Sequence, residues 1–189
     1  ALSELANHIE HKLSIELAIV SGGNSANLGW ALDAGEPGRI NNLRLGEAIL
    51  LGREPAHGQP LPGLHTDAFA LVSEVIESKE KPFLPWGSRG LTPFETSNAH
   101  RPHGMQAPAR VSRMQSILAI GRQDINPADL KVPVGINLLG ASSDHLIIDA
   151  GPERLPIGCE LTFGLNYAGL LAAMTSPFVA REFVMREPA

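Results

Sequence analysis

The 189-residue chain has little of several features that mark special classes of protein. Its one cysteine, Cys159, excludes an internal disulfide and is typical of a reducing compartment such as the cytoplasm. No apolar run approaches the roughly 20 residues that a membrane-spanning helix needs. Charged residues make up 19% of the chain, and its 15 basic and 20 acidic side chains form no block of like charge. We therefore expect no nucleic-acid partner and no membrane partner.

Residues 1–64 alternate between helix and strand patterns. They start at Ala1 without an initiator methionine or a signal peptide, so we expect the chain to be part of a longer polypeptide. Leu2, Leu5, Ile9 and Leu13 lie on one face of a predicted amphipathic helix, which should pack on a sheet. The patterns after it predict, in order, a strand over 15–20, a small-residue turn over 21–25, a helix over 26–32, and a strand with a short helix over 40–51. Such alternation predicts parallel strands in an α/β layer or barrel.

Residues 65–189 have a mostly β pattern. Short strands are predicted over 68–77, 116–121, 134–139, 145–149 and 160–163. The segment 82–113 is rich in proline and predicts a long surface loop, whereas proline, glycine and histidine over 55–66 mark a boundary. The predicted fold class is therefore α/β over 1–64 followed by an all-β domain over 65–189.

Two segments of the α/β part carry candidate site residues. The run Ser21–Ser25 offers backbone amides, close approach and a hydroxyl, which suit a phosphate, although a plain helix cap has the same composition. Arg44 lies in an apolar stretch, where a guanidinium needs a partner. A buried ion pair is the alternative explanation for Arg44.

The order and spacing of four segments resemble a known enzyme family. They are Ser21–Ser25, Asn42–Gly52 (NLRLGEAILLG), Gly140–Asp149 (GASSDHLIID) and Phe163–Val179 (FGLNYAGLLAAMTSPFV). Together they resemble the pyridoxal-phosphate-dependent amino-acid racemases of the alanine racemase type, most closely the ornithine racemase branch. The resemblance implies the last strands of a (β/α)8 barrel over 1–64 and the family's C-terminal β domain over 65–189. It also implies interconversion of L- and D-ornithine, or of another basic amino acid, by a homodimer with shared active sites.

The resemblance assigns five residues to the cofactor, pyridoxal 5'-phosphate. Ser25, Gly46 and the backbone amide of Glu47 would hold the phosphate, and Tyr167 would donate a further hydrogen bond to it. Arg44 would face the pyridine nitrogen, which it cannot protonate, so that the carbanion is returned to the amino acid. Without the resemblance, Tyr167 would be interpreted as a buried core tyrosine.

The segment Gly140–Asp149 carries the substrate assignment. Asp144 would bind the distal ammonium of a basic amino acid as a buried carboxylate, although it could be a simple loop cap. Ser143, Asp144 and His145 are the nearest candidates for proton transfer, which makes them the proposed catalytic residues. The nearby run Gly121–Asp124 resembles a family segment at the substrate entrance, with its role left open.

Departures from the family pattern keep other functions in view. None of the four lysines, Lys12, Lys79, Lys81 and Lys131, lies where the family's cofactor-bearing lysine would, so the chain alone should be inactive. Trp86 stands where alanine racemases have a proton-transferring tyrosine. His100 and His103 lack a third ligand, and no metal site is predicted.

The alternatives are a basic amino-acid decarboxylase of the same fold, whose cofactor-binding tetrapeptide matches Glu36–Arg39, and a non-catalytic protein that binds the cofactor or a partner. Arg44 argues against the decarboxylase, and Glu36–Arg39 is better explained as a Pro-Gly turn.

Overall fold

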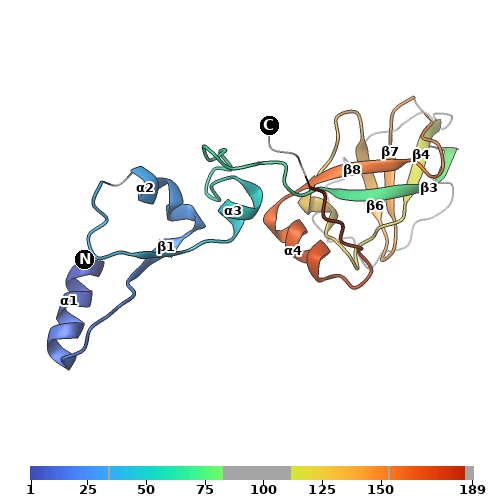
Figure 1. Ribbon diagram of the computed structural model, residues 1–189. Helices are drawn as coiled ribbons and strands as arrows, with labels where there is room; N and C mark the ends of the chain where they lie inside the picture. The colour runs from blue at the N-terminus through green and yellow to red at the C-terminus, as the bar shows by residue number, and fades with distance from the viewer. Residues whose placement is uncertain (34, 83–111, 153, 186–189) are drawn as a thin grey trace, which may run out of the picture. The chain divides into compact units, whose positions relative to one another are not determined.

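The chain divides into two compact units, which are described separately. The computed structural model describes residues 1–33, 35–82, 112–152 and 154–185 (Figure 1). The N-terminal unit is Ala1–Phe69 and the C-terminal unit is Ala70–Ala189. None of the helices in the described residues is long and apolar enough to cross a membrane.

The N-terminal unit alternates helices and strands as its sequence predicts. Its elements are α1 (Leu2–Leu13), β1 (Ser21–Asn24), η1 (Ser25–Asn27), α2 (Leu28–Asp33), β2 (Asn42–Arg44) and α3 (Glu47–Leu51). Strands β1 and β2 pair in parallel, with Ser21 opposite Asn42 and Asn24 opposite Arg44. The parallel arrangement expected from the helix and strand alternation is confirmed.

The first strand lies later in the chain than predicted. Residues 15–20 form no strand, and the run expected to be a turn is β1 itself. The cause is close packing between neighbouring segments: a Cβ on Gly22 would come within 2.4 Å of the Ile40 side chain. Only a residue without a side chain fits between the segments, so tertiary contact overrides the low strand propensity of glycine.

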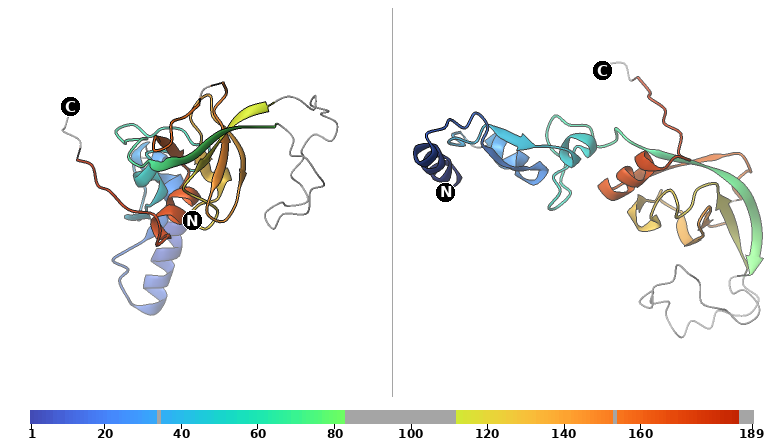
Figure 2. Two further views of the ribbon diagram at one scale, coloured as in Figure 1. Left: turned by 90° about the vertical axis from the view of Figure 1, so that its right-hand side faces the viewer. Right: turned by 90° about the horizontal axis from the view of Figure 1, so that it is seen from below.

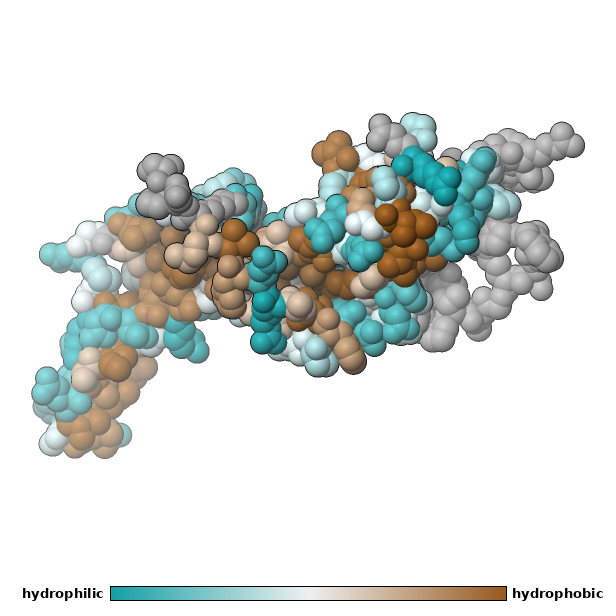
Figure 3. All heavy atoms as spheres, turned by 45° about the vertical axis from the view of Figure 1, so that its right-hand side comes forward, coloured by the Kyte–Doolittle hydropathy of each residue, from teal (hydrophilic) through white to brown (hydrophobic). Residues whose placement is uncertain are grey.

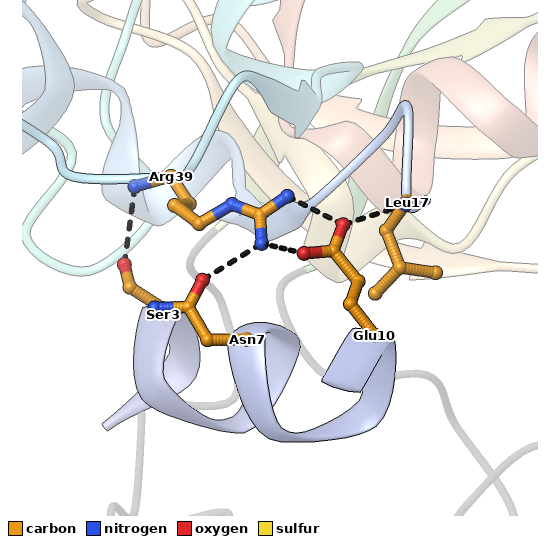
Figure 4. A network of polar contacts seen from close by, with 5 residues as sticks. All are labelled: Ser3, Asn7, Glu10, Leu17 and Arg39. Carbon is orange, nitrogen blue, oxygen red and sulfur yellow. Dashed lines mark hydrogen bonds and ion pairs between the residues drawn. The ribbon is translucent and has the colours of Figure 1, made fainter. Parts of the chain in front are cut away.

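Helix α1 is held by polar bonds rather than by an apolar face. The expected packing of that face on a sheet is not seen in the described residues, because Leu5 and Leu13 remain 54% and 60% exposed and only Ala6 is buried. Figure 4 shows that the Arg39 guanidinium instead donates to the Glu10 carboxylate from both terminal nitrogens and to Asn7 Oδ1 at 2.8 Å.

The N-terminal unit buries little apolar surface overall. Its buried apolar side chains are Ala6, Val20, Ala48 and Leu61. Several larger ones are exposed, including Ile19 at 69% and Leu32 at 67%. Brown apolar surface is correspondingly extensive on the visible face of this unit in Figure 3. Local polar contacts therefore carry much of the order in this unit.

The C-terminal unit is built on one antiparallel sheet. Its strands are β3 (Leu71–Pro82), β4 (Ser112–Leu118), β5 (Leu130–Lys131), β6 (Asn137–Ala141), β7 (Leu146–Asp149) and β8 (Glu160–Leu165), in the spatial order β5-β8-β3-β4-β7-β6. Five of these strands match predicted ones within a few residues. The two-residue β5 and the short helix η2 (Pro127–Asp129) before it were not predicted. The predicted fold class, α/β followed by all-β, is confirmed.

Strand β3 bends because its register changes partway along. Leu71, Ser73 and Val75 alternate as buried residues, and the pairing with β4 then shifts between Val75 and Glu77, after which Ser78 is the buried one. Such a bulge increases the local twist of a strand. Figure 2 shows the resulting curl of the sheet. The core on the inside of the curl includes Val75, Leu118, Leu146, Ile148 and Phe163, each at 0% exposure.

Helix α4 (Tyr167–Thr175) follows the last strand directly. Its Leu170 and Ala173 are buried at 5% exposure. The loop predicted over 82–113 falls mainly on residues 83–111, so Trp86, His100 and His103 lie outside the described residues. Ser112 and Arg113 belong to β4, which starts before the predicted end of that loop.

The contact between Arg39 and Glu10 predicts an acid-sensitive anchor for α1. Hydrogen bonds from the Arg39 guanidinium and from the Leu17 amide lower the pKa of Glu10 from 4.5 to about 2. Because the pKa is lowered in the folded chain, the stabilisation is complete above pH 4.5 and is lost as the pH falls to about 2. Glu10→Gln should increase hydrogen exchange of α1 at pH 6, after correction for the intrinsic rate, and remove the further increase between pH 4.5 and 2. Glu4→Gln, which changes an exposed residue of the same helix, is the control. Equal exchange of α1 in the wild type and in both variants would contradict the role of Glu10.

Candidate functional site

The turn after β1 is locked by two asparagines. Asn24 Oδ1 accepts a hydrogen bond from Ala26 N at 3.0 Å, and Asn27 Oδ1 accepts one from Asn24 N at 3.2 Å. Gly23 adopts φ +156, and a Cβ there would lie 2.2 Å from Asn27 Oδ1. The reciprocal caps and the glycine thus hold the chain in the sharp turn that presents Ser25.

The Ser25 hydroxyl joins this turn to the start of α3. Ser25 is 7% exposed, and its Oγ accepts hydrogen bonds from Gly46 N at 3.1 Å and from Ala48 N at 3.2 Å. The two segments predicted to form the phosphate site therefore lie together. Because both lone pairs of Oγ receive a donor, the hydroxyl can still donate its own proton.

Glu47 begins α3 and is half-buried. As the first helical residue, it has no acceptor within the helix for its amide. Among the described residues, neither the Ser25 hydroxyl proton nor the Glu47 amide has an acceptor, and two such donors are what an anion requires. These residues fit the phosphate of the pyridoxal phosphate that the resemblance implies.

Arg44 ends β2 and is exposed. It takes part in none of the ion pairs found among the described residues. The alternative of a buried ion pair is therefore wrong. The physical reason is that β2 is a three-residue strand on which only Leu43 is half-buried, so that its apolar sequence neighbours do not enclose the guanidinium.

Tyr167 is the first residue of α4, on a well-anchored turn. The preceding Asn166 accepts from Gly169 N at 2.8 Å and donates from Nδ2 to Asp129 Oδ1 at 2.7 Å. Tyr167 is 37% exposed, so the alternative of a buried core tyrosine is wrong. It belongs to the C-terminal unit, and its convergence with Ser25 and Gly46 stays a prediction.

Ser143, Asp144 and His145 lie in the tight connection between β6 and β7, and all three are exposed. Ser142 closes this loop: its amide donates to His145 O at 2.8 Å, and its Oγ accepts from His145 N at 3.1 Å. The capping side chain is therefore that of Ser142, not that of Asp144. Asp144 is also not the buried carboxylate that was expected, because a loop this short leaves its tip outside the sheet.

The run Gly121–Asp124 lies directly against this loop. The amides of Arg122 and Gln123 donate to Ser142 O at 2.9 Å and to Ser143 O at 3.0 Å. Asp124 is 6% exposed and accepts a hydrogen bond from Ser176 Oγ at 2.7 Å. Sequence analysis missed the burial of Asp124, since its partner is remote in the chain. The only local signal was an Asp shortly after a buried strand.

The tetrapeptide Glu36–Arg39 forms the expected turn. Gly38 adopts φ +67, and Ile40 N donates to Pro37 O at 3.4 Å. Arg39 is engaged by α1 through its guanidinium and through its amide, which donates to Ser3 Oγ at 3.1 Å. Among the described residues, no group of three or more His, Cys, Asp or Glu side chains is placed to hold a metal ion.

The fold resembles part of several solved structures, among them alanine racemases. The alanine racemase of Oenococcus oeni has a TM-score of 0.52 at 22% identity, over 86% of this chain and 43% of that one. The alanine racemase of Bartonella henselae, solved with covalently bound pyridoxal phosphate, has a TM-score of 0.51 at 17% identity, over 86% and 42%. The D-threonine aldolase of Filomicrobium marinum shares the fold, with a TM-score of 0.53 at 13% identity, over 90% of this chain and 38% of that one. These likenesses establish the fold alone.

The sequence is similar to those of two racemases, one of ornithine and one of lysine. The chain is 38% identical over 188 residues to the ornithine racemase of Acetoanaerobium sticklandii, covering 97% of this chain and 51% of that protein. It is 39% identical over 186 residues to the lysine racemase of Thermotoga maritima, covering 96% and 50%. The chain thus spans about half the length of these curated relatives. No family model matches it. The resemblance to amino-acid racemases that the four sequence segments indicated is confirmed.

The hydrogen bonds of Ser25 lead to a structural prediction. Ser25→Ala should leave the amides of Gly46 and Ala48 without an acceptor and speed their hydrogen exchange by roughly tenfold or more, as expected for the loss of a buried bond. Nuclear magnetic resonance on the full chain measures both amides. Ser21→Ala, which changes an exposed serine on the preceding strand β1, should leave them unchanged. Undiminished protection in Ser25→Ala would show that the hydroxyl does not join the two segments.

Proposed function

We propose that the chain is part of a pyridoxal-phosphate-dependent racemase that interconverts the L and D forms of a basic amino acid, with ornithine or lysine as the substrate class. The observation that carries this proposal is the 38% and 39% identity to an ornithine racemase and a lysine racemase over nearly the whole chain. The cofactor-bearing lysine would come from the part of the relatives that this chain does not span. The chain alone would be inactive for that reason.

Cofactor binding would start at the junction between η1 and α3. The Ser25 hydroxyl proton and the Glu47 amide would donate to the phosphate, with Gly46 keeping the backbone close. Tyr167 is 37% exposed at an anchored helix start and, as the resemblance implies, would add a third donor. Pyridoxal phosphate, when bound, supplies the electron sink that makes the α proton of an amino acid removable.

Arg44 would control the strength of that electron sink. A guanidinium is too weak an acid to transfer a proton to a pyridine nitrogen. Its exposure at the end of β2 leaves it able to face such a ring. A ring that is not protonated withdraws electrons less strongly, which favours return of the proton to the same carbon over other reactions.

Asp144 would select the substrate. An exposed carboxylate at a loop tip attracts the distal ammonium of ornithine or lysine through a charge-assisted hydrogen bond. Because it is exposed, leaving it unpaired beside an apolar side chain costs less than for a buried group, so the discrimination against alanine should be moderate. Ser143, Asp144 and His145 would supply the second proton-transfer group, opposite the lysine.

The decarboxylase hypothesis finds less support. Its sequence arguments were the pair Ser143 and Asp144, which does not exclude a decarboxylase, and the tetrapeptide Glu36–Arg39, whose glutamate and arginine would bind cofactor. Arg39 is committed to Glu10 and Asn7 on α1 instead. We further propose that the enzyme is a cytoplasmic homodimer in which each β domain completes the partner's site, as the resemblance implies.

The substrate assignment predicts a selective loss in Asp144→Asn. In the complete enzyme, kcat/KM for ornithine or lysine should fall by roughly tenfold, because a charged hydrogen bond is replaced by a neutral one, while alanine should change by less than about threefold. Glu160→Gln, which removes one exposed negative charge on β8, is the control. Equal losses for alanine and for the basic amino acid would remove Asp144 from substrate selection.

The cofactor assignment predicts a change in reaction outcome for Arg44→Glu. A carboxylic acid beside the ring nitrogen would strengthen the electron sink, so racemisation should fall by about tenfold or more while transamination rises. The ratio of keto acid to D-amino acid, measured by chromatography, is the readout. Arg44→Lys keeps the positive charge and should keep that ratio low. An unchanged ratio in Arg44→Glu would place Arg44 away from the ring.

A further inference from the structure

We infer that residues 121–129 act as a positioning brace, which fixes the Ser142–His145 loop relative to α4. Within it, Gly121 and Asp124 are the positioning residues. They touch no substrate, but set where the Asp144 carboxylate lies with respect to the helix that begins at Tyr167. This inference rests on the proposed function, because it assigns Asp144 to the substrate and Tyr167 to the cofactor.

One side of the brace holds the loop through its backbone. The amides of Arg122 and Gln123 donate to the carbonyl oxygens of Ser142 and Ser143 at 2.9 and 3.0 Å. These bonds use main-chain atoms on both sides, so they fix the path of the loop regardless of its exposed side chains. The position of Asp144, next in the chain, follows from them.

Gly121 brings the two backbones into direct contact. A Cβ on Gly121 would lie 2.2 Å from Ser143 O and 2.4 Å from Asp144 C and N. These are backbone atoms and cannot rotate away, so any side chain at 121 must push the loop outward. The φ of Gly121 is negative, which any residue can adopt. Its requirement for glycine therefore comes from the loop and not from its own conformation.

The other side of the brace holds α4 at both ends. At the C-terminal end, the buried Asp124 accepts from Ser176 Oγ at 2.7 Å and from Gly121 N at 3.4 Å. At the N-terminal end, Asp129 accepts from Asn166 N at 3.1 Å and from Asn166 Nδ2 at 2.7 Å. Between these points, Ile125 is 1% exposed and anchors the segment in the core. One rigid segment therefore joins the proposed substrate loop to the proposed phosphate-binding helix.

A pair of glycine variants tests the brace in the complete enzyme. Gly121→Ala should displace the Ser143–Asp144 backbone. It should lower kcat/KM for the basic amino acid by about tenfold or more, mostly through KM, and lower kcat/KM for the substrate alanine by less. The matched control is Gly140→Ala, on β6 just before the loop, where a Cβ meets nothing within 4 Å. It should stay within about twofold of the wild type. If Gly121→Ala keeps the full preference for the basic amino acid over alanine, the inference is overturned.

Hydrogen exchange on the 189-residue chain tests the same contacts without any activity. Gly121→Ala should expose the amides of Arg122 and Gln123, and Gly140→Ala should not. Asp124→Asn, a milder change, should speed exchange both in the loop and at the C-terminal turn of α4, because it weakens the bond with Ser176. Unchanged exchange in Gly121→Ala and in Asp124→Asn would overturn the brace. Should the complete enzyme fail to racemise any basic amino acid, the proposed function falls, while the exchange data still decide whether the brace exists.

Discussion

One hydroxyl group holds the candidate cofactor site together. Ser25 Oγ receives the amides that begin α3, and this bond joins two segments separated by about 20 residues of chain. The surrounding unit has few buried apolar side chains that could hold these segments together. Because both lone pairs of the oxygen are occupied, its proton is the hydrogen-bonding group that remains. The bond that orders the structure therefore also creates the donor that an anion would meet.

The C-terminal unit differs, because it has a large core and its proposed site residues are exposed. Its curled sheet buries residues such as Phe163 and Leu146 completely, yet Asp144 and Tyr167 remain at the surface. Loops and helix starts on a rigid sheet can be positioned precisely only when something ties them to it. Residues 121–129 supply this tie through main-chain bonds to one side and through Asp124 and Asp129 to the other.

Local sequence patterns predicted the elements whose cause is local. Helix α1 and strands β7 and β8 follow from periodic apolar residues, and the matching structure buries one face of each strand. Strand β1 was missed because glycine and serine have little preference for strands, and only the Ile40 side chain packed over Gly22 explains it. The burial of Asp124 depends on Ser176, and the meeting of Ser25 with Gly46 depends on the parallel pair. Such long-range contacts leave no mark in a local pattern. The residues of Ser21–Ser25 suggested a phosphate by themselves, whereas the other cofactor residues were assigned by family resemblance.

The most direct test of the account is the fate of the α hydrogen and the carboxyl group of a basic amino acid. The complete enzyme, loaded with pyridoxal phosphate, is incubated with L-ornithine or L-lysine in deuterated water, and the products are separated by chiral chromatography and weighed by mass spectrometry. A racemase predicts the D enantiomer with one deuterium at the α carbon and no released carbon dioxide. Formation of the diamine with carbon dioxide, or recovery of the L-amino acid without deuterium, would contradict it.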